Sequence, residues 1–205
     1  PLPMRWTLGY HQCRWSYKTE AEVRQLAADF RRYEISCDAI YFDIDYMDGY
    51  RVFTWNKENF TDPDRLIADL KEQGFQAVTI IDPGVKKDED YYVYREGIDH
   101  NYFAKDANGD VYINAVWPGD SAFPDFGRQE VRDWWGEKHQ FLLDKGIMGV
   151  WNDMNEPASF NGPLPDDVVF SEEDEVTDHK WMHNVYGHNM SRATYQGLRK
   201  LSDKR

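Results

Sequence analysis

The sequence predicts an α/β fold built around a parallel β-sheet, and three observations predict it. Apolar strand-like segments alternate four times with amphipathic helix-like segments. Polar and aromatic residues gather directly after each predicted strand. No GxGxxG sequence follows the first strand, which argues against a doubly wound dinucleotide-binding sheet. Alternation of this kind is typical of parallel strands joined by right-handed helical crossovers.

Eight segments carry this alternation. In chain order, the predicted strands span 5–12, 38–46, 75–82 and 146–153, and the predicted helices span 19–34, 62–74, 128–146 and 188–203. Thr19 followed by Glu22 matches a capping box at the start of the first helix. Asp62 and Pro63 are typical of a helix start, and Gly74 is typical of a helix end.

Two segments interrupt the alternation and are predicted to be insertions. Residues 83–125 carry alternating apolar residues on both sides of Asn108-Gly109, which predicts a hairpin inserted after the third strand. Residues 162–178 are acidic and contain proline, so we expect a long loop with a solvated charged face.

The residues that follow the strands favour a barrel over a doubly wound sheet. Polar and aromatic residues occupy 11–15, 43–48, 82–84 and 153–156. Functional residues at the carboxyl ends of several strands are typical of the (β/α)₈ TIM barrel, which takes about 250 residues and eight units. The chain has four predicted units and begins with Pro1. We therefore expect residues 1–205 to be a partial catalytic barrel domain, the first half of the barrel of a longer enzyme.

Composition narrows the classes of ligand. The chain has 205 residues, a formal net charge of -13 and 16% aromatic residues. Such a charge repels nucleic-acid backbones and anionic membranes, so neither is an expected partner, and a neutral ligand fits better. No apolar run approaches the ~20 residues that a membrane-spanning helix needs. Cys13 and Cys37 are expected to be buried free thiols. Without HExxH or a Cys/His pairing we expect no metal and no cofactor.

The stretch GVWNDMNEPASFNG, residues 149–162, is the strongest candidate site. Asp153 follows an apolar run, where desolvation of an unpaired carboxylate is costly. It can serve as nucleophile, general base, metal ligand or structural anchor. Asp43 and Asp45 end the second strand and, with a period of two, would share one face. Such a pair can bind hydroxyls or a cation, or can pair with a neighbouring arginine such as Arg51. Asp82 lies in Asp-Pro-Gly, where a simple turn is the preferred interpretation.

Aromatic residues next to hydroxyl-binding carboxylates indicate a carbohydrate ligand. Trp117 lies among Pro and Gly in a loop, where its ring can cover the apolar face of a sugar. Two other classes stay open. A metal-dependent barrel enzyme would hold a divalent cation with Asp43, Asp45, Asp153 and Glu156. A non-catalytic sugar-binding module would use the tryptophans alone.

Six segments, in one order along nearly the whole chain, match a known family: LGYHQCRWSY, FDIDYMDGYRVFTWN, IIDPG, VWPGDSAFPDF, WNDMNEPASFNGP and HNVYG. On these motifs the chain resembles the retaining α-glucosidases of glycoside hydrolase family 31. The resemblance implies a nucleophile at Asp153 that forms a covalent glycosyl-enzyme intermediate. It implies that Asp43 binds hydroxyls of the sugar in the cleaved position.

The resemblance also assigns the surroundings of that sugar. Its apolar walls would be Ile44, Ile80, Trp117, Trp151 and Met154. Trp15 would edge the leaving-group side, and Glu156 would support the site through a charged partner. The general acid/base Asp of the family lies on a later strand, beyond residue 205. We therefore expect the 205 residues alone to be inactive or nearly so.

The expected substrate is an oligosaccharide or a small α-glucoside with terminal α-linked glucose. Within the family, α-xylosidase, sulfoquinovosidase and lyase activities are alternatives, but WNDMNEP resembles the glucosidase branch more closely. An open half-barrel would expose the edges of its first and fourth strands, which invites pairing with another chain. We therefore expect a homo-oligomer, specifically a dimer, or poor solubility.

Overall fold

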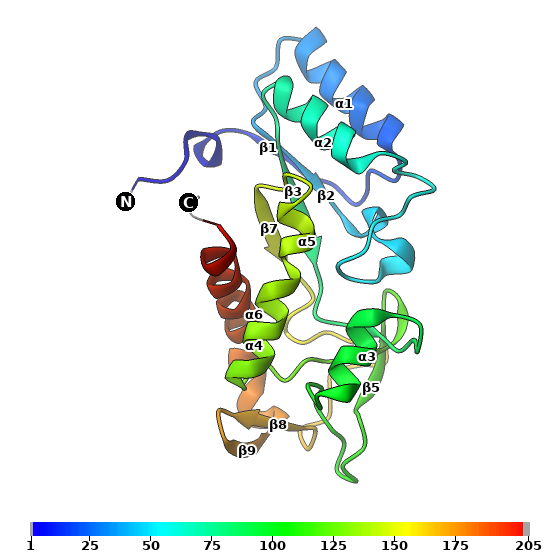
Figure 1. Ribbon diagram of the computed structural model, residues 1–205, viewed down its shortest axis with the longest axis vertical. Helices are drawn as coiled ribbons and strands as arrows, with labels where there is room; N and C mark the ends of the chain where they lie inside the picture. Colours follow the sequence, from blue (N-terminus) through cyan, green and yellow to red (C-terminus); the bar gives the residue numbers. More distant parts are fainter. Residues whose placement is uncertain (1, 203–205) are drawn as a thin grey trace. The chain divides into compact units, whose positions relative to one another are not determined.

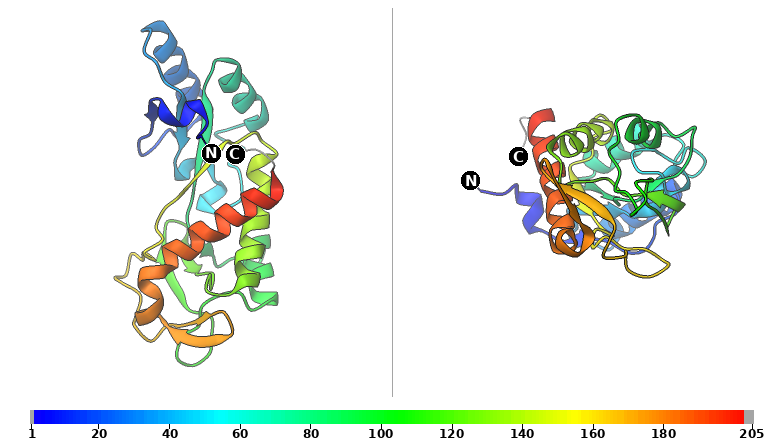
Figure 2. Two further views of the ribbon diagram at one scale, coloured as in Figure 1. Left: turned by 90° about the vertical axis from the view of Figure 1, so that its left-hand side faces the viewer. Right: turned by 90° about the horizontal axis from the view of Figure 1, so that it is seen from below.

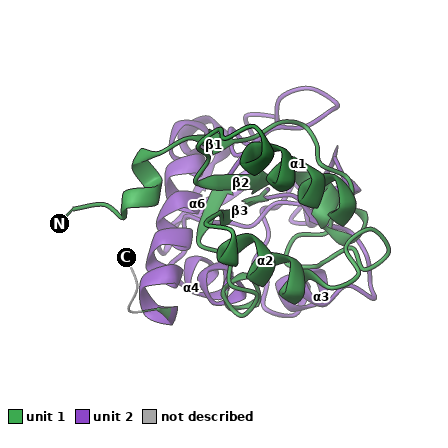
Figure 3. Cartoon of the chain, turned by 90° about the horizontal axis from the view of Figure 1, so that it is seen from above, with its two compact units in different colours: residues 1–81, 140–151, 202–205 green, residues 82–139, 152–201 purple. Residues whose placement is uncertain are grey.

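The computed structural model describes residues 2–202, which form two compact units (Figure 3). The first contains the described parts of residues 1–81, 140–151 and 202–205, and the second contains residues 82–139 and 152–201. In the described part of the chain no helix is long and apolar enough to cross a membrane.

A four-stranded sheet forms the centre of the first unit. Its order is β1-β2-β3-β7, with bounds His11–Gln12, Ala39–Phe42, Gln76–Ile81 and Gly149–Asn152. The pairs β1–β2 and β2–β3 are parallel, with Ala39 opposite both His11 and Gln76. The backbone N–H of Met148 donates to the Ala77 carbonyl at 2.9 Å next to β7. The predicted α/β class with parallel strands is confirmed.

Helices α1 (Glu20–Arg32) and α2 (Pro63–Glu72) pack side by side in this unit (Figure 1). The predicted cap at Thr19 is confirmed, since its side chain accepts from the Glu22 N–H at 3.2 Å. The reciprocal bond differs from a capping box: the Glu22 carboxylate accepts from the Lys18 N–H at 2.6 Å. Arg24 joins the two helices through Asp69 at 2.7 Å.

The signals in the second helix act as the sequence predicts. Asp62 caps α2 by accepting from the Arg65 N–H at 3.0 Å, and Pro63 occupies the first turn. Gly74 follows the helix with φ +86°, a left-handed conformation that glycine adopts at little cost. Between these ends Leu66, Ile67 and Leu70 are buried, with 3% exposure or less, which holds α2 against β3.

Two predicted strands are shorter than expected. Residues 5–8 form a 3₁₀ helix, Arg5–Leu8, instead of the start of a strand. The Thr7 hydroxyl and N–H both donate to the Met4 carbonyl, at 2.7 and 3.1 Å, and such local bonds compete with strand pairing. The second strand ends at Phe42, and a 3₁₀ helix, Ile44–Tyr46, follows.

The second unit contains more regular structure than the sequence predicted. Its elements are β4 (Val85–Lys86), α3 (Tyr92–Asp99), β5 (Ile113–Val116), β6 (Gly119–Ala122), α4 (Gln129–Lys138), β8 (Val169–Glu172), β9 (Glu175–Asp178) and α6 (His179–Leu201). Strands β4, β6 and β5 form an antiparallel sheet in that order.

The predicted hairpin after the third strand is present, but its main turn lies elsewhere. Strands β5 and β6 turn at Trp117-Pro118, with Val116 opposite Gly119. The Asn108-Gly109 turn closes only an isolated antiparallel bridge between Lys105 and Val111. Helix α3 was not predicted, because its aromatic residues favour strands and no cap marks its start.

Helices α4 and α6 pack against each other (Figure 2). Neither helix has the bounds that the sequence predicted. The predicted helix 128–146 is divided after α4, and a separate helix α5 (Gln140–Leu143) lies in the first unit. Helix α6 starts at His179, well before residue 188, and the predicted end at residue 203 lies outside the described residues. The acidic segment 162–178, predicted to be a loop, contains the hairpin of β8 and β9.

Candidate active site

Three strands of the parallel sheet are each followed directly by an aspartate. Asp43 follows β2, Asp82 follows β3, and Asp153 follows β7. Asp43 and Asp82 are buried, with 6% and 5% exposure, whereas Asp153 is partly exposed. Carboxyl ends of strands are where an open α/β sheet and a barrel both place their functional groups.

The Asp43 side chain is held by a hydrogen bond from the backbone of the next residue. One carboxylate oxygen, Oδ1, accepts from the Ile44 N–H at 2.8 Å, and this cap starts the 3₁₀ helix. The Tyr46 hydroxyl in that helix donates to the Ile80 carbonyl of β3 at 2.8 Å. Ile44 and Ile80 are buried at 2% and 1% exposure. The structure therefore brings Asp43, Ile44 and Ile80 together in the first unit.

Asp45 does not share a strand face with Asp43, so that expectation is wrong. The strand has already ended, and Asp45 lies inside the 3₁₀ helix. Burial raises the pKa of the Tyr50 phenol, and the adjacent Asp45 carboxylate, hydrogen-bonded to it, raises that pKa further. Asp45 is thus hydrogen-bonded to Tyr50.

Trp151 ends a row of rings on the first unit. Its ring lies 6.3 Å from that of Tyr41, which lies 5.7 Å from His11, which stacks on Trp6 at 5.5 Å. His11 bonds at both nitrogens, with the Tyr41 hydroxyl at 3.1 Å and the Trp6 carbonyl at 3.0 Å. Trp151 joins this network through its contact with the Tyr41 ring. Trp15, in contrast, is 67% exposed in the loop after β1.

Asp153 begins a tightly held loop in the second unit. The preceding Asn152 accepts a hydrogen bond from the Thr194 hydroxyl of α6 at 3.2 Å. Met154 has φ +56°, a left-handed conformation that costs a non-glycine residue about 1 kcal/mol or more. Its carbonyl accepts from the Ala158 N–H at 3.0 Å, which closes the turn. The Asp153 carboxylate itself has no hydrogen bond or ion pair with any residue from 2 to 202.

The loop also brings a ring that the sequence analysis missed. Phe160 meets Trp117 edge-on, with ring centroids 5.0 Å apart and planes at 87°. The Phe160 N–H donates to the Ala115 carbonyl of β5 at 2.8 Å. Both rings remain accessible, at 53% for Phe160 and 37% for Trp117. The signal was an aromatic residue beside Asn-Gly within the stretch that contains Asp153.

Glu156 and the possible metal ligands complete the predicted set. Glu156 is exposed, and its expected charged partner is not among residues 2–202. Within those residues no group of three or more His, Cys, Asp or Glu side chains is placed to hold a metal ion. Of the predicted site residues, Trp15, Asp43, Ile44, Ile80 and Trp151 belong to the first unit, and Trp117, Asp153, Met154 and Glu156 belong to the second.

Comparison with known proteins identifies the family. The model of the glycosyl hydrolases family 31 TIM-barrel domain matches residues 1–205. The chain belongs to glycosyl hydrolase family 31. The family 31 chain is 54% identical over 203 residues to α-glucosidase 2 of Bacillus thermoamyloliquefaciens, covering 98% of the chain and 26% of that protein. It is 37% identical over 204 residues to neutral α-glucosidase C of Homo sapiens, covering 98% and 22%.

Solved structures agree with the family. A glucosidase II α subunit matches with TM-score 0.88 and 34% identity, over 97% of this family 31 chain and 22% of that one. A Flavobacterium johnsoniae family 31 dextranase, complexed with isomaltotriose, matches with TM-score 0.89 and 30% identity, over 99% and 25%. The chain therefore spans about a quarter of the length of these proteins. Its α/β fold is that of the N-terminal part of the barrel.

Proposed function

We propose that this chain supplies the nucleophile half of a retaining glycoside hydrolase that removes terminal α-linked glucose from oligosaccharides. The Asp153 carboxylate carries the proposal, because it lies directly after β7 with no internal ion pair among residues 2–202. A nucleophile has to be ionised and uncommitted before substrate binds. The relatives named α-glucosidases support glucose as the sugar.

In the proposed first step, an Asp153 oxygen attacks the anomeric carbon. The bond from that carbon to the leaving oxygen breaks, and the leaving oxygen takes a proton from a general acid. Water then attacks the anomeric carbon of the glycosyl-enzyme, gives its proton to the same group, and frees the Asp153 carboxylate. Two inversions at one carbon give net retention, with about 5 Å between the two carboxyl groups.

The general acid/base is proposed to lie beyond residue 205, in a longer enzyme whose barrel this chain begins. The chain covers only 22–26% of its relatives' lengths, which leaves room for the remaining strands. Residues 1–205 would then be a partial catalytic barrel domain. Asp153 would have its catalytic partner only when the other half of the barrel is present.

The remaining site residues are proposed to hold the sugar. Asp43 would bind hydroxyls of the glucosyl unit, as the family resemblance implies, from its buried position directly after β2. The apolar walls would be Ile44, Ile80, Trp117, Trp151 and Met154. Trp15 would edge the leaving-group side, where its exposed ring can cover a second sugar. Glu156 would find its charged partner in the rest of the barrel.

Azide rescue in the full-length enzyme tests the role of Asp153. Asp153→Ala should lower kcat by a factor on the order of 10⁴, as expected for loss of a nucleophile. With α-glucosyl fluoride and azide, the variant should form β-glucosyl azide, because azide enters the vacated space and inverts the carbon once. Asp110→Ala, at an exposed carboxylate of the same unit, serves as the matched control and should retain activity. Retained activity in Asp153→Ala, or an α-configured azide, would contradict the assignment.

The isolated 205 residues test where the acid lies. We expect no measurable turnover of an aryl α-glucoside, because a carboxylate without its acid cannot expel a poor leaving group efficiently. The same assay on the full-length enzyme is the positive control. Robust turnover by the 205 residues would place the acid within this chain.

A further inference from the structure

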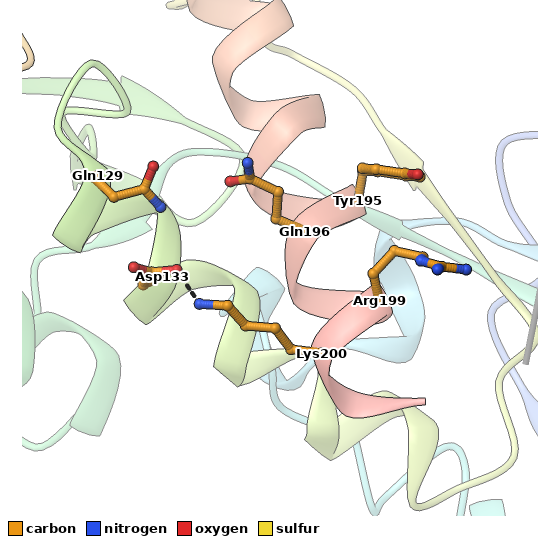
Figure 4. A pocket seen from close by; sticks show the side chains of 6 residues that line it. All are labelled: Gln129, Asp133, Tyr195, Gln196, Arg199 and Lys200. Carbon is orange, nitrogen blue, oxygen red and sulfur yellow. Dashed lines mark hydrogen bonds and ion pairs between the residues drawn. The ribbon is translucent and has the colours of Figure 1, made fainter. Parts of the chain in front are cut away.

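The hollow between helices α4 and α6 of the second unit is bordered by surface side chains (Figure 4). Lys200 forms an ion pair with Asp133 across it, whereas Tyr195 and Arg199 point away from α4. These groups do not converge on one point, so they select no ligand. A more ordered set of side chains lies in the first unit, in the row of rings that ends at Trp151.

This row of rings begins and ends beside strand β7. A Cβ built on Gly149 would lie 3.6 Å from Cη2 of Trp6, so the Trp6 ring lies against the start of the strand. Trp151 lies two residues further on, and side chains two apart on a strand share a face. His11 and Tyr41 join these ends, with ring centroid distances of 5.5, 5.7 and 6.3 Å from Trp6 to Trp151. The four rings and β7 therefore form a closed circle of contacts.

Hydrogen bonds fix the orientation of His11 within this row. Its Nε2 lies 3.0 Å from the Trp6 carbonyl oxygen, which can only accept, so Nε2 carries the hydrogen. In the neutral ring Nδ1 then has a free lone pair, and it accepts from the Tyr41 hydroxyl at 3.1 Å. Both nitrogens are used, so the imidazole cannot turn over without losing both bonds.

The carbonyl that holds His11 is itself fixed by the 3₁₀ helix Arg5–Leu8. The same Trp6 carbonyl accepts from the Gly9 N–H at 3.1 Å, which closes that helix. The Trp6 indole N–H donates to the Met4 sulfur at 3.3 Å. The 3₁₀ helix that replaces the start of the predicted first strand thus anchors the chain of bonds from Trp6 through His11 to Tyr41.

We propose that His11 is a positioning residue for Trp151. It holds the Tyr41 ring against Trp151 and so fixes the apolar wall that Trp151 presents to the glucosyl unit. This role rests on the proposed function, in which Trp151 forms part of that wall. Without its bond to His11, the Tyr41 side chain would be ordered only when sugar binds, and ordering side chains on binding lowers affinity.

The bonds of His11 favour this role over simple packing. An aromatic side chain without nitrogens would fill the same space and stack on Trp6. His11 instead places two polar atoms among rings, and each has one partner. Hydrogen bonds are directional, whereas apolar contact is not, so this arrangement sets an orientation in addition to filling volume.

Two matched variants of the full-length enzyme test the proposal by calorimetric titration with 1-deoxynojirimycin, an iminosugar of glucose shape. In His11→Asn the amide oxygen takes the place of Nδ1 and can accept from Tyr41, so affinity should stay within about twofold of the parent. In His11→Gln the longer side chain reaches the Trp6 carbonyl and leaves Tyr41 without its acceptor. Binding should then be about fivefold weaker, within the cost of ordering one side chain.

A double-mutant cycle shows whether the effect passes through Trp151. Tyr41→Phe removes only the hydroxyl and should weaken binding as much as His11→Gln does. In a Trp151→Leu background there is no ring left to position, so Tyr41→Phe should cause no further loss. Losses that simply add would show that the bond acts elsewhere, and they would overturn the role of His11. His100→Gln, at an exposed histidine of the second unit, is the control and should bind as the parent does.

The outcomes separate this role from the proposed catalysis. Equal affinities of His11→Asn and His11→Gln, or parental affinity in Tyr41→Phe, overturn the positioning role and leave the azide rescue at Asp153 unaffected. Failure of that rescue would remove the nucleophile without removing the coupling between Tyr41 and Trp151. Thermal unfolding identifies any variant that does not fold, and Tyr41→Phe, which loses a single oxygen atom, then carries the test.

Discussion

At the scale of single residues, two buried titratable side chains of the second unit, Asp125 and His139, have opposite effects on how stability depends on pH. Asp125 is 4% exposed, and burial raises its pKa to about 6 although it accepts a hydrogen bond from the Ser171 N–H. His139 is fully buried, and burial lowers its pKa to about 4 although its Nδ1 bonds to the Trp135 carbonyl at 3.0 Å. Desolvation disfavours the charged form of both groups.

The two shifts act in opposite directions on stability. The contribution of Asp125 to the free energy of unfolding is fully present below its ordinary pKa of 3.8. It is lost as pH rises through about 6. The contribution of His139 is fully present above 6.5 and is lost as pH falls through about 4. Each amounts to about 3 kcal/mol. Between about pH 4 and pH 6 they offset each other.

Single substitutions should reveal this compensation. Asp125→Asn leaves only the His139 effect, so relative to the parent its free energy of unfolding should rise from pH 4 to pH 6. His139→Asn keeps a donor near the Trp135 carbonyl and leaves only the Asp125 effect. Relative to the parent, its free energy of unfolding should fall over the same range. Urea denaturation at several pH values measures both slopes.

Exposed residues of the same types serve as controls. Asp110→Asn and His100→Asn lie in the same unit and should keep the pH profile of the parent. If the Asp125 and His139 variants also kept that profile, burial would not control these two groups.

At the scale of elements, a glycine pair sets the distance between α4 and α6. A Cβ built on Gly197 would lie 2.3 Å from the Cα of Gly136, far inside normal contact. A Cβ on Gly136 would lie 2.8 Å from the Cα of Gly197. No side chain fits between the helices at this point, so both positions require glycine for close approach rather than for backbone freedom.

Gly197→Ala should therefore destabilise the protein. Overpacking at such a contact costs about 1–3 kcal/mol, which exceeds the gain of about 1 kcal/mol from replacing glycine by alanine inside a helix. Chemical denaturation measures the difference. Ser191→Ala, at an exposed position of the same helix, should change the free energy of unfolding by no more than about 0.5 kcal/mol. If the Gly197→Ala variant were more stable than the parent, the two helices would be able to move apart at no cost.

Element boundaries show which signals the sequence carried. Asp62, Pro63 and Gly74 mark α2 correctly, because capping and glycine preferences act within a few residues. The strand predicted over 38–46 ends early because Asp43 caps the following turn, and Tyr46 is held by the carbonyl of Ile80 from another strand. The capping bond is local, but the second bond joins residues 34 positions apart and has no local signature.

At the scale of the whole chain, the outer strands of the sheet have edges at which another chain can pair. Strands β1 and β7 are at the two ends of the order β1-β2-β3-β7. Outer strands present backbone groups that can pair with another chain. We expect the isolated 205 residues to form a dimer or to be poorly soluble. Sedimentation velocity over a range of concentrations measures this, and a monomer at every concentration would contradict it.

Local sequence patterns were enough to predict the α/β class, the four strand–helix units and the position of Asp153 directly after a strand. Periodicity, caps and short motifs carry this information because they depend on residues close together in the chain. Three contacts are visible only in the folded chain: Phe160 meets Trp117, Gly136 faces Gly197, and Tyr50 bonds to Asp45. The Phe160–Trp117 and Gly136–Gly197 contacts join distant segments, and Tyr50 reaches Asp45 only because an unpredicted turn follows β2. Burial, which shifts Asp125 and His139, likewise depends on how the whole unit packs.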